Sequence, residues 1–127
     1  MSPHTTAFIS GHGNLTQEEF LQHYVPQITS ALADGVEHFV VGDFRGADTL
    51  GQEYLAKNHP AVKVTVYHMF ENPRSTVPSH ARMGGFTTDE ERDSAMTKAS
   101  SRDIAWIRPG KKKSGTAQNI ARRQAAL

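Results

Sequence analysis

Three glycine-containing turns are the segments of this sequence whose residue types best suit ligand chemistry. Residues 10–13 are Ser-Gly-His-Gly, residues 42–48 are Gly-Asp-Phe-Arg-Gly-Ala-Asp, and residues 114–116 are Ser-Gly-Thr. Glycine permits positive φ and lets backbone amides approach an anion closely. A single glycine of this kind often does no more than end a strand. Three such turns in one short chain favour a phosphate-binding site.

These turns supply most of the candidate ligand-binding residues, which are Gly11, His12, Gly42, Arg45, Gly46, Asp48, Ser114, Gly115 and Thr116. Arg45 either binds phosphate through two parallel hydrogen bonds or pairs with a neighbouring aspartate, Asp43 or Asp48. His12 is alternatively a packing or surface residue. For Asp48 we favour a structural role, in which its carboxylate accepts hydrogen bonds from backbone amides of its own turn.

The spacing of these glycines limits the class of ligand. No G-x-G-x-x-G or G-x-x-x-x-G-K-[ST] motif follows a predicted strand, so the sequence does not favour dinucleotide-dependent hydride transfer or ATP-dependent phosphoryl transfer. We therefore expect a mononucleotide or a nucleoside diphosphate derivative, and no cofactor. The seven histidines show no H-x-x-x-H or H-E-x-x-H spacing, so no metal site is predicted.

The turns lie between segments that alternate in predicted structure. Strands are expected at residues 5–10, 37–41, 62–68 and 103–107, and helices at about 16–34, 47–57, 88–99 and 116–125. Pro26 should bend or split the first helix, because proline removes an amide donor. This alternation predicts the α/β class, as a three-layer Rossmann-like domain with a mostly parallel sheet of four to five strands flanked by helices.

One segment does not fit the alternation. Residues 70–87 are polar and rich in proline, glycine and serine, and they exceed the ~12 to 15 residues beyond which a structureless loop becomes uncommon. Loops of that length are usually functional lids or disordered segments. We predict a lid or a subunit-exchange element here.

The composition narrows the class of partner. The 127 residues suit a single domain spanning 1–127, and a net charge of +1 gives no global field for nucleic acid, so a small ligand is the expected partner.

The absence of cysteine excludes disulfides and a thiolate nucleophile. No membrane segment or targeting segment is recognisable, so we expect a soluble, cytoplasmic protein. The basic run at residues 111–113 either meets phosphate or keeps a turn solvated, and the second interpretation is favoured.

Four segments together resemble the short stand-alone members of the SLOG superfamily, which includes the lonely guy phosphoribohydrolases and the DNA-processing protein DprA. Residues 9–12 are similar to its T-G-H-R turn, with Gly13 in place of arginine, and residues 41–48 to its G-x-x-R-G-A-D motif. Gly84-Gly85 followed by residues 91–96 resembles G-G/A-x-x-R-N-x-x-M, with Asp93 in place of asparagine. Residues 114–120 resemble its G-T phosphate loop. The four segments occur in the family's order and spacing and cover most of the chain.

The resemblance implies a Rossmann-like nucleotide pocket in which Gly115, Thr116 and Arg92 hold phosphate. Members either cleave the N-glycosidic bond of nucleotides or bind nucleotide-derived signals. Their pockets are often completed by a neighbouring subunit, so a homo-oligomer is expected. The phosphoribohydrolases carry a catalytic glutamate where this chain has Asn119. Asparagine can act neither as a nucleophile nor as a base, so Asn119 is a further candidate for ligand binding and not for catalysis.

Asp93 is the candidate catalytic residue, with Asp48 and Asp43 as alternatives. Departure of a base leaves positive charge on the sugar, which a nearby carboxylate stabilises. Asp93 is equally consistent with an exposed carboxylate at a helix N-terminus. The prediction is therefore a protein that hydrolyses a nucleoside 5'-monophosphate or, alternatively, a non-catalytic sensor of a ligand such as an ADP-ribose compound. A DprA-like nucleic-acid accessory is disfavoured by the near-neutral charge.

Overall fold

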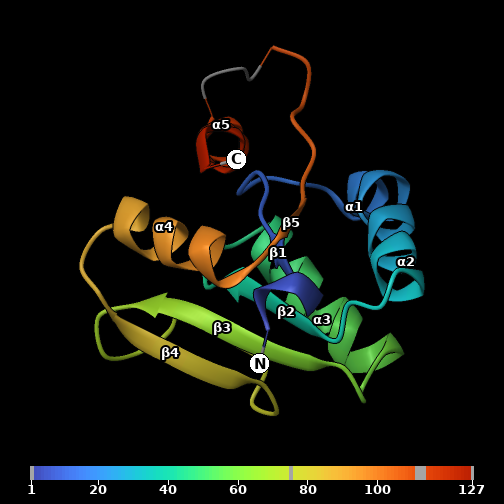
Figure 1. Cartoon of the computed structure of the whole chain (residues 1–127), viewed down its shortest axis with the longest axis horizontal. Coiled ribbons are helices and arrows are strands. Elements are labelled where there is room, and N and C mark those ends of the chain that lie inside the picture. The colour runs from blue at the N-terminus through green and yellow to red at the C-terminus, as the bar shows by residue number, and fades with distance from the viewer. Residues whose placement is uncertain (1, 75, 111–113, 127) are drawn as a thin grey trace.

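A computed structural model describes residues 2–74, 76–110 and 114–126 (Figure 1). The basic run at 111–113 lies outside the described residues. The elements in chain order are η1 (Pro3–Thr5), β1 (Thr6–Ile9), α1 (Gln17–His23), α2 (Val25–Ala33), β2 (His38–Gly42), α3 (Ala47–Asn58), β3 (Lys63–Met69), β4 (Ala81–Phe86), α4 (Asp89–Ala99), β5 (Arg102–Ile104) and α5 (Gly115–Ala126).

The strands form one parallel sheet of five strands in the order β4-β3-β2-β1-β5. The predicted parallel sheet is confirmed. After β4 the chain crosses the whole sheet through α4 to reach β5, beside β1. The helices that connect β1 to β2 therefore lie on one face of the sheet, and α4, which leads to β5 on the other side of β1, lies on the opposite face. This arrangement leaves a crevice at the carboxyl ends of the strands.

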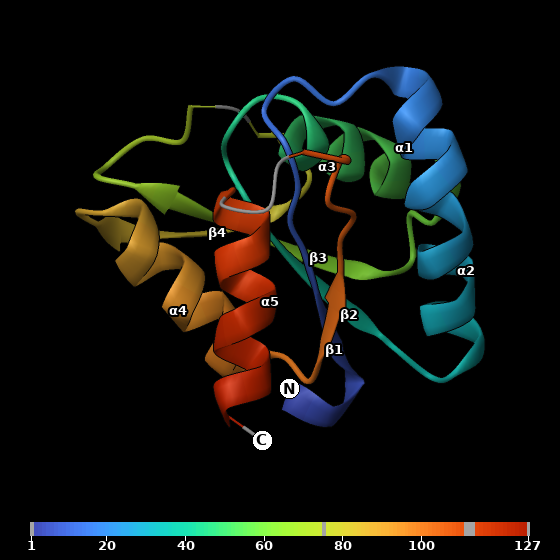
Figure 2. The same cartoon turned by 90° about the horizontal axis from the view of Figure 1, so that it is seen from above.

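Alternating residues of the strands build a core on each face of the sheet. Ile9, Val41 and Val66 belong to the larger core, which α1, α2 and α3 cover with side chains such as Phe20, Ile28 and Leu55. Phe8, Val40 and Tyr67 point to the other face, where they pack with Met96 of α4. Figures 1 and 2 show the sheet between these two layers of helices, as the predicted three-layer Rossmann-like fold requires.

The first helical segment divides as predicted at Pro26, which occupies the first turn of α2. The N-terminus of α1 carries the expected capping box, in which Thr16 Oγ1 accepts from the Glu19 amide at 3.1 Å and Glu19 Oε1 accepts from the Thr16 amide at 3.0 Å. These reciprocal bonds satisfy amides that the first helical turn leaves unpaired. The sequence therefore defines locally where α1 begins.

The prediction of a loop over residues 70–87 is wrong for its second half, because residues 81–86 form β4 at the edge of the sheet. Most of this strand is exposed, and it lacks the apolar alternation that identifies a buried strand. Its pairing with β3 is what makes it a strand. The connection between β3 and β4 is consequently shorter than predicted.

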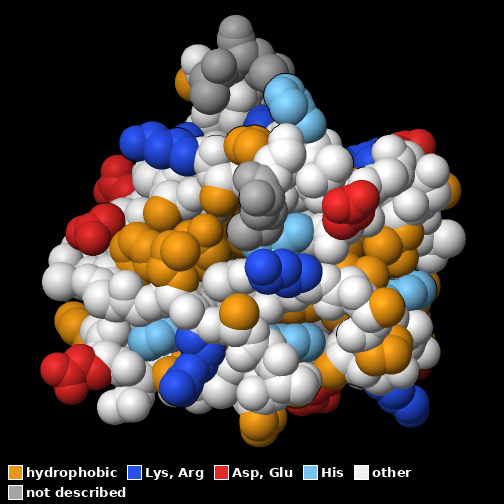
Figure 3. Space-filling model, turned by 60° about the horizontal axis from the view of Figure 1, so that its bottom comes forward, with side chains coloured by type: hydrophobic (Ala, Val, Ile, Leu, Met, Phe, Trp, Pro, Cys, Tyr) orange, Lys and Arg blue, Asp and Glu red, His pale blue; other side chains and the backbone are white. Residues whose placement is uncertain are grey.

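The surface view in Figure 3 shows hydrophobic side chains gathered at the left and also at the right of the face. Among the described residues drawn there, acidic and basic side chains are interspersed and form no continuous basic stripe. This arrangement agrees with the small net charge of the chain. No helix within the described ranges is long and apolar enough to cross a membrane.

Candidate functional site

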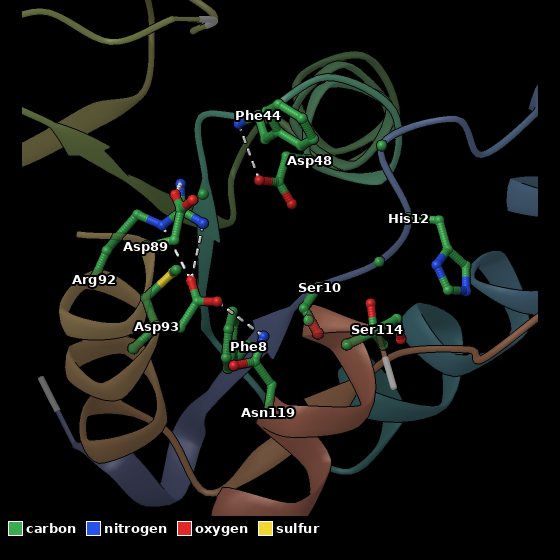
Figure 4. Close-up of a pocket in the computed structure, with 16 residues that line it drawn as sticks. Phe8, Ser10, His12, Phe44, Asp48, Asp89, Arg92, Asp93, Ser114 and Asn119 are labelled. Carbon is green, nitrogen blue, oxygen red and sulfur yellow. Dashed lines mark hydrogen bonds and ion pairs between the residues drawn. The ribbon is translucent and has the colours of Figure 1, made fainter. Parts of the chain in front are cut away.

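A pocket with a volume of about 340 Å³ lies at the carboxyl ends of β1 and β2, between α4 and the start of α5 (Figure 4). Ten of the twelve predicted site residues line it, namely Gly11, His12, Gly42, Asp48, Arg92, Asp93, Ser114, Gly115, Thr116 and Asn119. They come from turns and helices far apart in the sequence. The fold thus brings together the turns that sequence analysis had identified separately.

The other two predicted residues, Arg45 and Gly46, lie outside the described lining of this pocket. Arg45 is exposed, and its guanidinium carbon lies 5.2 Å from the centre of the Phe44 ring. Gly46 has φ +76°, and a Cβ atom there would lie 2.4 Å from the carbonyl oxygen of His12. Gly46 therefore lets two turns approach each other.

One end of the pocket is formed by the N-terminus of α5 and offers groups that suit an anion. Ser114 Oγ accepts from the Ala117 amide at 3.2 Å, while the amides of Gly115 and Thr116 make no backbone hydrogen bond among the described residues. A Cβ atom at Gly115 would meet no atom of the described residues within 4 Å. Unpaired amides at a helix N-terminus attract anions.

Ser10 adds a hydroxyl to this end, and sequence analysis did not select it as a ligand. Its side chain lines the pocket and lies beside Ser114 in Figure 4. Ser10 is 6% exposed, and its Oγ has no hydrogen-bond partner among the described residues. A buried hydroxyl normally has a partner, so this one is available to a bound ligand.

His12 has its ring on the outer side of the β1 turn, directed away from Asp48 in Figure 4. Its Nε2 accepts from the Arg108 amide at 2.9 Å, and its ring lies edge-on to Trp106 with centroids 6.2 Å apart. These contacts hold the segment after β5 against the β1 turn. The ring has this packing role whether or not His12 also meets a ligand.

The opposite end of the pocket is rich in carboxylates. The Arg92 guanidinium lies 2.9 Å from Asp43 and 3.0 Å from Asp93, and it also reaches Asp89 at 3.5 Å. Each of these contacts uses a donor that a phosphate would need. Arg92 is thus surrounded by aspartates, and its expected role as a phosphate ligand has no support in this geometry.

Arg74, from the connection between β3 and β4, completes this cluster. Its backbone amide and its guanidinium both bond to Asp43, at distances of 2.8 to 3.3 Å. Arg74 and Arg92 therefore make the ion pairs with Asp43 that were one of the two alternatives for Arg45. Burial by itself would raise the pKa of the Asp43 carboxyl, but the hydrogen bonds and charge of Arg74, with the charge of Arg92, hold it below its usual value.

Asp48 has a different electrostatic environment. Its Oδ2 accepts from the Phe44 amide at 3.0 Å, which is the expected hydrogen bond within its own turn. Burial raises the pKa of Asp48 to about 7, and the nearby Asp93 and Asp43 add to this effect, whereas Arg92 and the Phe44 amide oppose it. A pocket carboxyl that is partly protonated near neutral pH can donate a proton to a ligand.

Sequence analysis missed Arg74 and Asp89 as well as Ser10. Arg74 lies in a polar segment with no periodic pattern, and its partner Asp43 is distant in the sequence, so no local signal identified the pair. Asp89 begins α4, where acidic residues are common for reasons unrelated to a site.

Comparison with known proteins identified no relative. A scan against protein-family models, a search of curated proteins and a search of solved structures found no match to this chain.

Proposed function

We propose that the protein binds a nucleoside 5'-monophosphate and hydrolyses its N-glycosidic bond. The observation that carries the proposal is the opposite polarity of the two ends of one pocket. In Figure 4 the start of α5 and Ser10 lie on one side of the pocket, and the carboxylates of Asp48 and Asp93 lie on the other. Such a ligand has the same polarity, because its phosphate is anionic and its sugar becomes cationic as the base departs.

The two carboxyls differ in a way that suits this reaction. Asp93 is ion-paired with Arg92 at 3.0 Å, whereas burial raises the pKa of Asp48 to about 7. Acid and base roles are commonly divided between carboxyls with different environments. In the proposed step, water attacks the anomeric carbon and gives a proton to Asp93. The carbon–nitrogen bond breaks, and the base leaves with the proton from Asp48. Exchange with solvent restores both groups.

The resemblance to the SLOG superfamily points toward the same class of ligand. The catalytic glutamate of its phosphoribohydrolase members is replaced by Asn119, so the reactive carboxylate would come from α4 instead of α5. This replacement also favours a second candidate function, a sensor that binds an ADP-ribose-type compound without cleaving it. Tight binding in calorimetry without any turnover would support the sensor.

The test is incubation with a panel of ribonucleoside and deoxyribonucleoside monophosphates, followed by chromatography for free base and sugar phosphate. We expect release from at least one member, reduced about a hundredfold or more by Asp93→Asn. Asp34→Asn is the matched control, because Asp34 is 59% exposed and pairs with Arg102 outside the pocket. No release from any member of the panel would refute the hydrolysis. Absence of ADP-ribose binding in calorimetry would refute the sensor as well.

A further inference from the structure

We infer that Asn119 is a positioning residue, which orients the Asp93 carboxylate through its side-chain amide and is itself fixed by Arg122. The kinetic consequence of this inference rests on the proposed function, whereas the contact itself does not. Asn119 is 4% exposed and lies on the side of α5 that faces α4 (Figure 4).

The orientation of the amide follows from its two neighbours. Arg122 Nη1 lies 2.6 Å from Asn119 Oδ1, and Asn119 Nδ2 lies 3.2 Å from Asp93 Oδ2. A guanidinium can only donate hydrogen bonds, so the atom facing Arg122 must be the oxygen. The nitrogen then faces Asp93 and donates to it.

The second oxygen of Asp93 is held from the opposite side. Arg92 Nε and Nη2 both lie 3.0 Å from Asp93 Oδ1, and Arg92 is in turn bonded to the fully buried Asp43 at 2.9 Å. Donors on both oxygens fix the plane of the carboxylate. The Asp93 side chain is 15% exposed and lines the pocket.

The uncharged amide is the important property of residue 119. A glutamate or aspartate at this position would place a second carboxylate against Asp93, and two adjacent carboxylates resist being ionised together. The Asn119 amide donates a hydrogen bond to the Asp93 carboxylate and adds no charge beside it. This explains physically why a chain whose reactive carboxylate lies on α4 carries asparagine on α5.

Asn119→Asp tests the inference with almost no change in volume. On the nucleoside monophosphate that the wild type cleaves, we expect kcat to fall about 10- to 100-fold, as loss of a hydrogen bond to a charged group predicts. KM should change by less than about threefold, since the lost contact acts on the reacting carboxylate. The acidic limb of the pH–rate profile should move to higher pH. Gln118→Leu, at an exposed neighbour on α5, should change none of these values.

A second measurement needs no activity. In the nucleotide-free protein, the Asn119 side-chain amide signal in an NMR spectrum should move on Asp93→Asn and on Arg122→Leu, while the Gln118 amide signal stays in place. Thermal unfolding of each variant verifies that it folds. The inference would be overturned if the Asn119 amide signal kept its chemical shift in both variants, or if Asn119→Asp showed the kinetics of the wild type. If the wild type cleaves nothing, the proposed hydrolysis fails and the NMR result still decides the contact.

Discussion

Replacing Asp48 with asparagine should stabilise the protein near neutral pH, although Asp48 is part of the pocket. Burial raises its pKa from 3.8 to about 7 in the folded protein. Between these values the folded chain keeps a proton that the unfolded chain has released, so the free energy of unfolding falls as pH rises. One pH unit corresponds to about 1.4 kcal/mol, so the wild type loses about 4 kcal/mol across this window. Asparagine does not titrate and avoids this loss.

Urea unfolding at about pH 4 and pH 8, followed by fluorescence of Trp106, the only tryptophan, measures the effect. The difference in unfolding free energy between Asp48→Asn and wild type should increase toward pH 8 by an amount approaching about 4 kcal/mol. Burial lowers the pKa of His38 to about 4, which acts in the opposite direction, but His38 is present in both proteins and cancels. A difference that is the same at both pH values would refute the assigned environment of Asp48.

Three further predictions concern residues around the pocket. Arg74→Ala removes two side-chain hydrogen bonds to the buried Asp43 carboxylate and should lower the free energy of unfolding in urea by about 1–3 kcal/mol. Arg45→Ala, at an exposed side chain, should change it by less than about 0.5 kcal/mol. Equal losses would contradict the assignment of the ion pair. Gly46→Ala combines φ +76° with a backbone clash and should lower the free energy of unfolding by about 3 kcal/mol or more. Gly35→Ala, with φ +98° and open space around it, should lower it by about 1–2 kcal/mol. Thermal unfolding compares the two variants, and the reverse order would be inconsistent with the turn geometry. Ser10→Ala removes a buried hydroxyl without a partner among the described residues, so it should preserve stability but weaken nucleotide binding in calorimetry about tenfold; unchanged affinity would remove Ser10 from the site.

The sequence predicted the elements whose signals are local. The capping box at Thr16 and the split at Pro26 depend on residues within one helical turn, and both are present. The predicted strand over residues 103–107 is wrong at its end, because β5 ends at Ile104. The Gln27 side-chain amide bonds to the amide and carbonyl of Ala105, at 3.3 and 3.0 Å, and replaces the pairing that a strand would have made. Such a contact between distant segments leaves no periodic pattern.

The site was predictable to the extent that it uses glycine turns at strand ends, because the topology of a parallel sheet brings these ends together. The roles of its charged residues were not predictable in the same way. Arg92 and Arg74 are typical phosphate ligands by residue type, yet both are bonded to Asp43. Only the three-dimensional arrangement decides whether an arginine meets a ligand or a neighbouring carboxylate.

The most direct measurement is a crystal structure of the Asp93→Asn variant soaked with the nucleoside monophosphates of the panel. We predict that the phosphate contacts the amides of Gly115 and Thr116 and the Ser10 hydroxyl, with the sugar between Asp48 and residue 93. A phosphate bound against Arg92, or a nucleotide bound outside this pocket, would contradict the account.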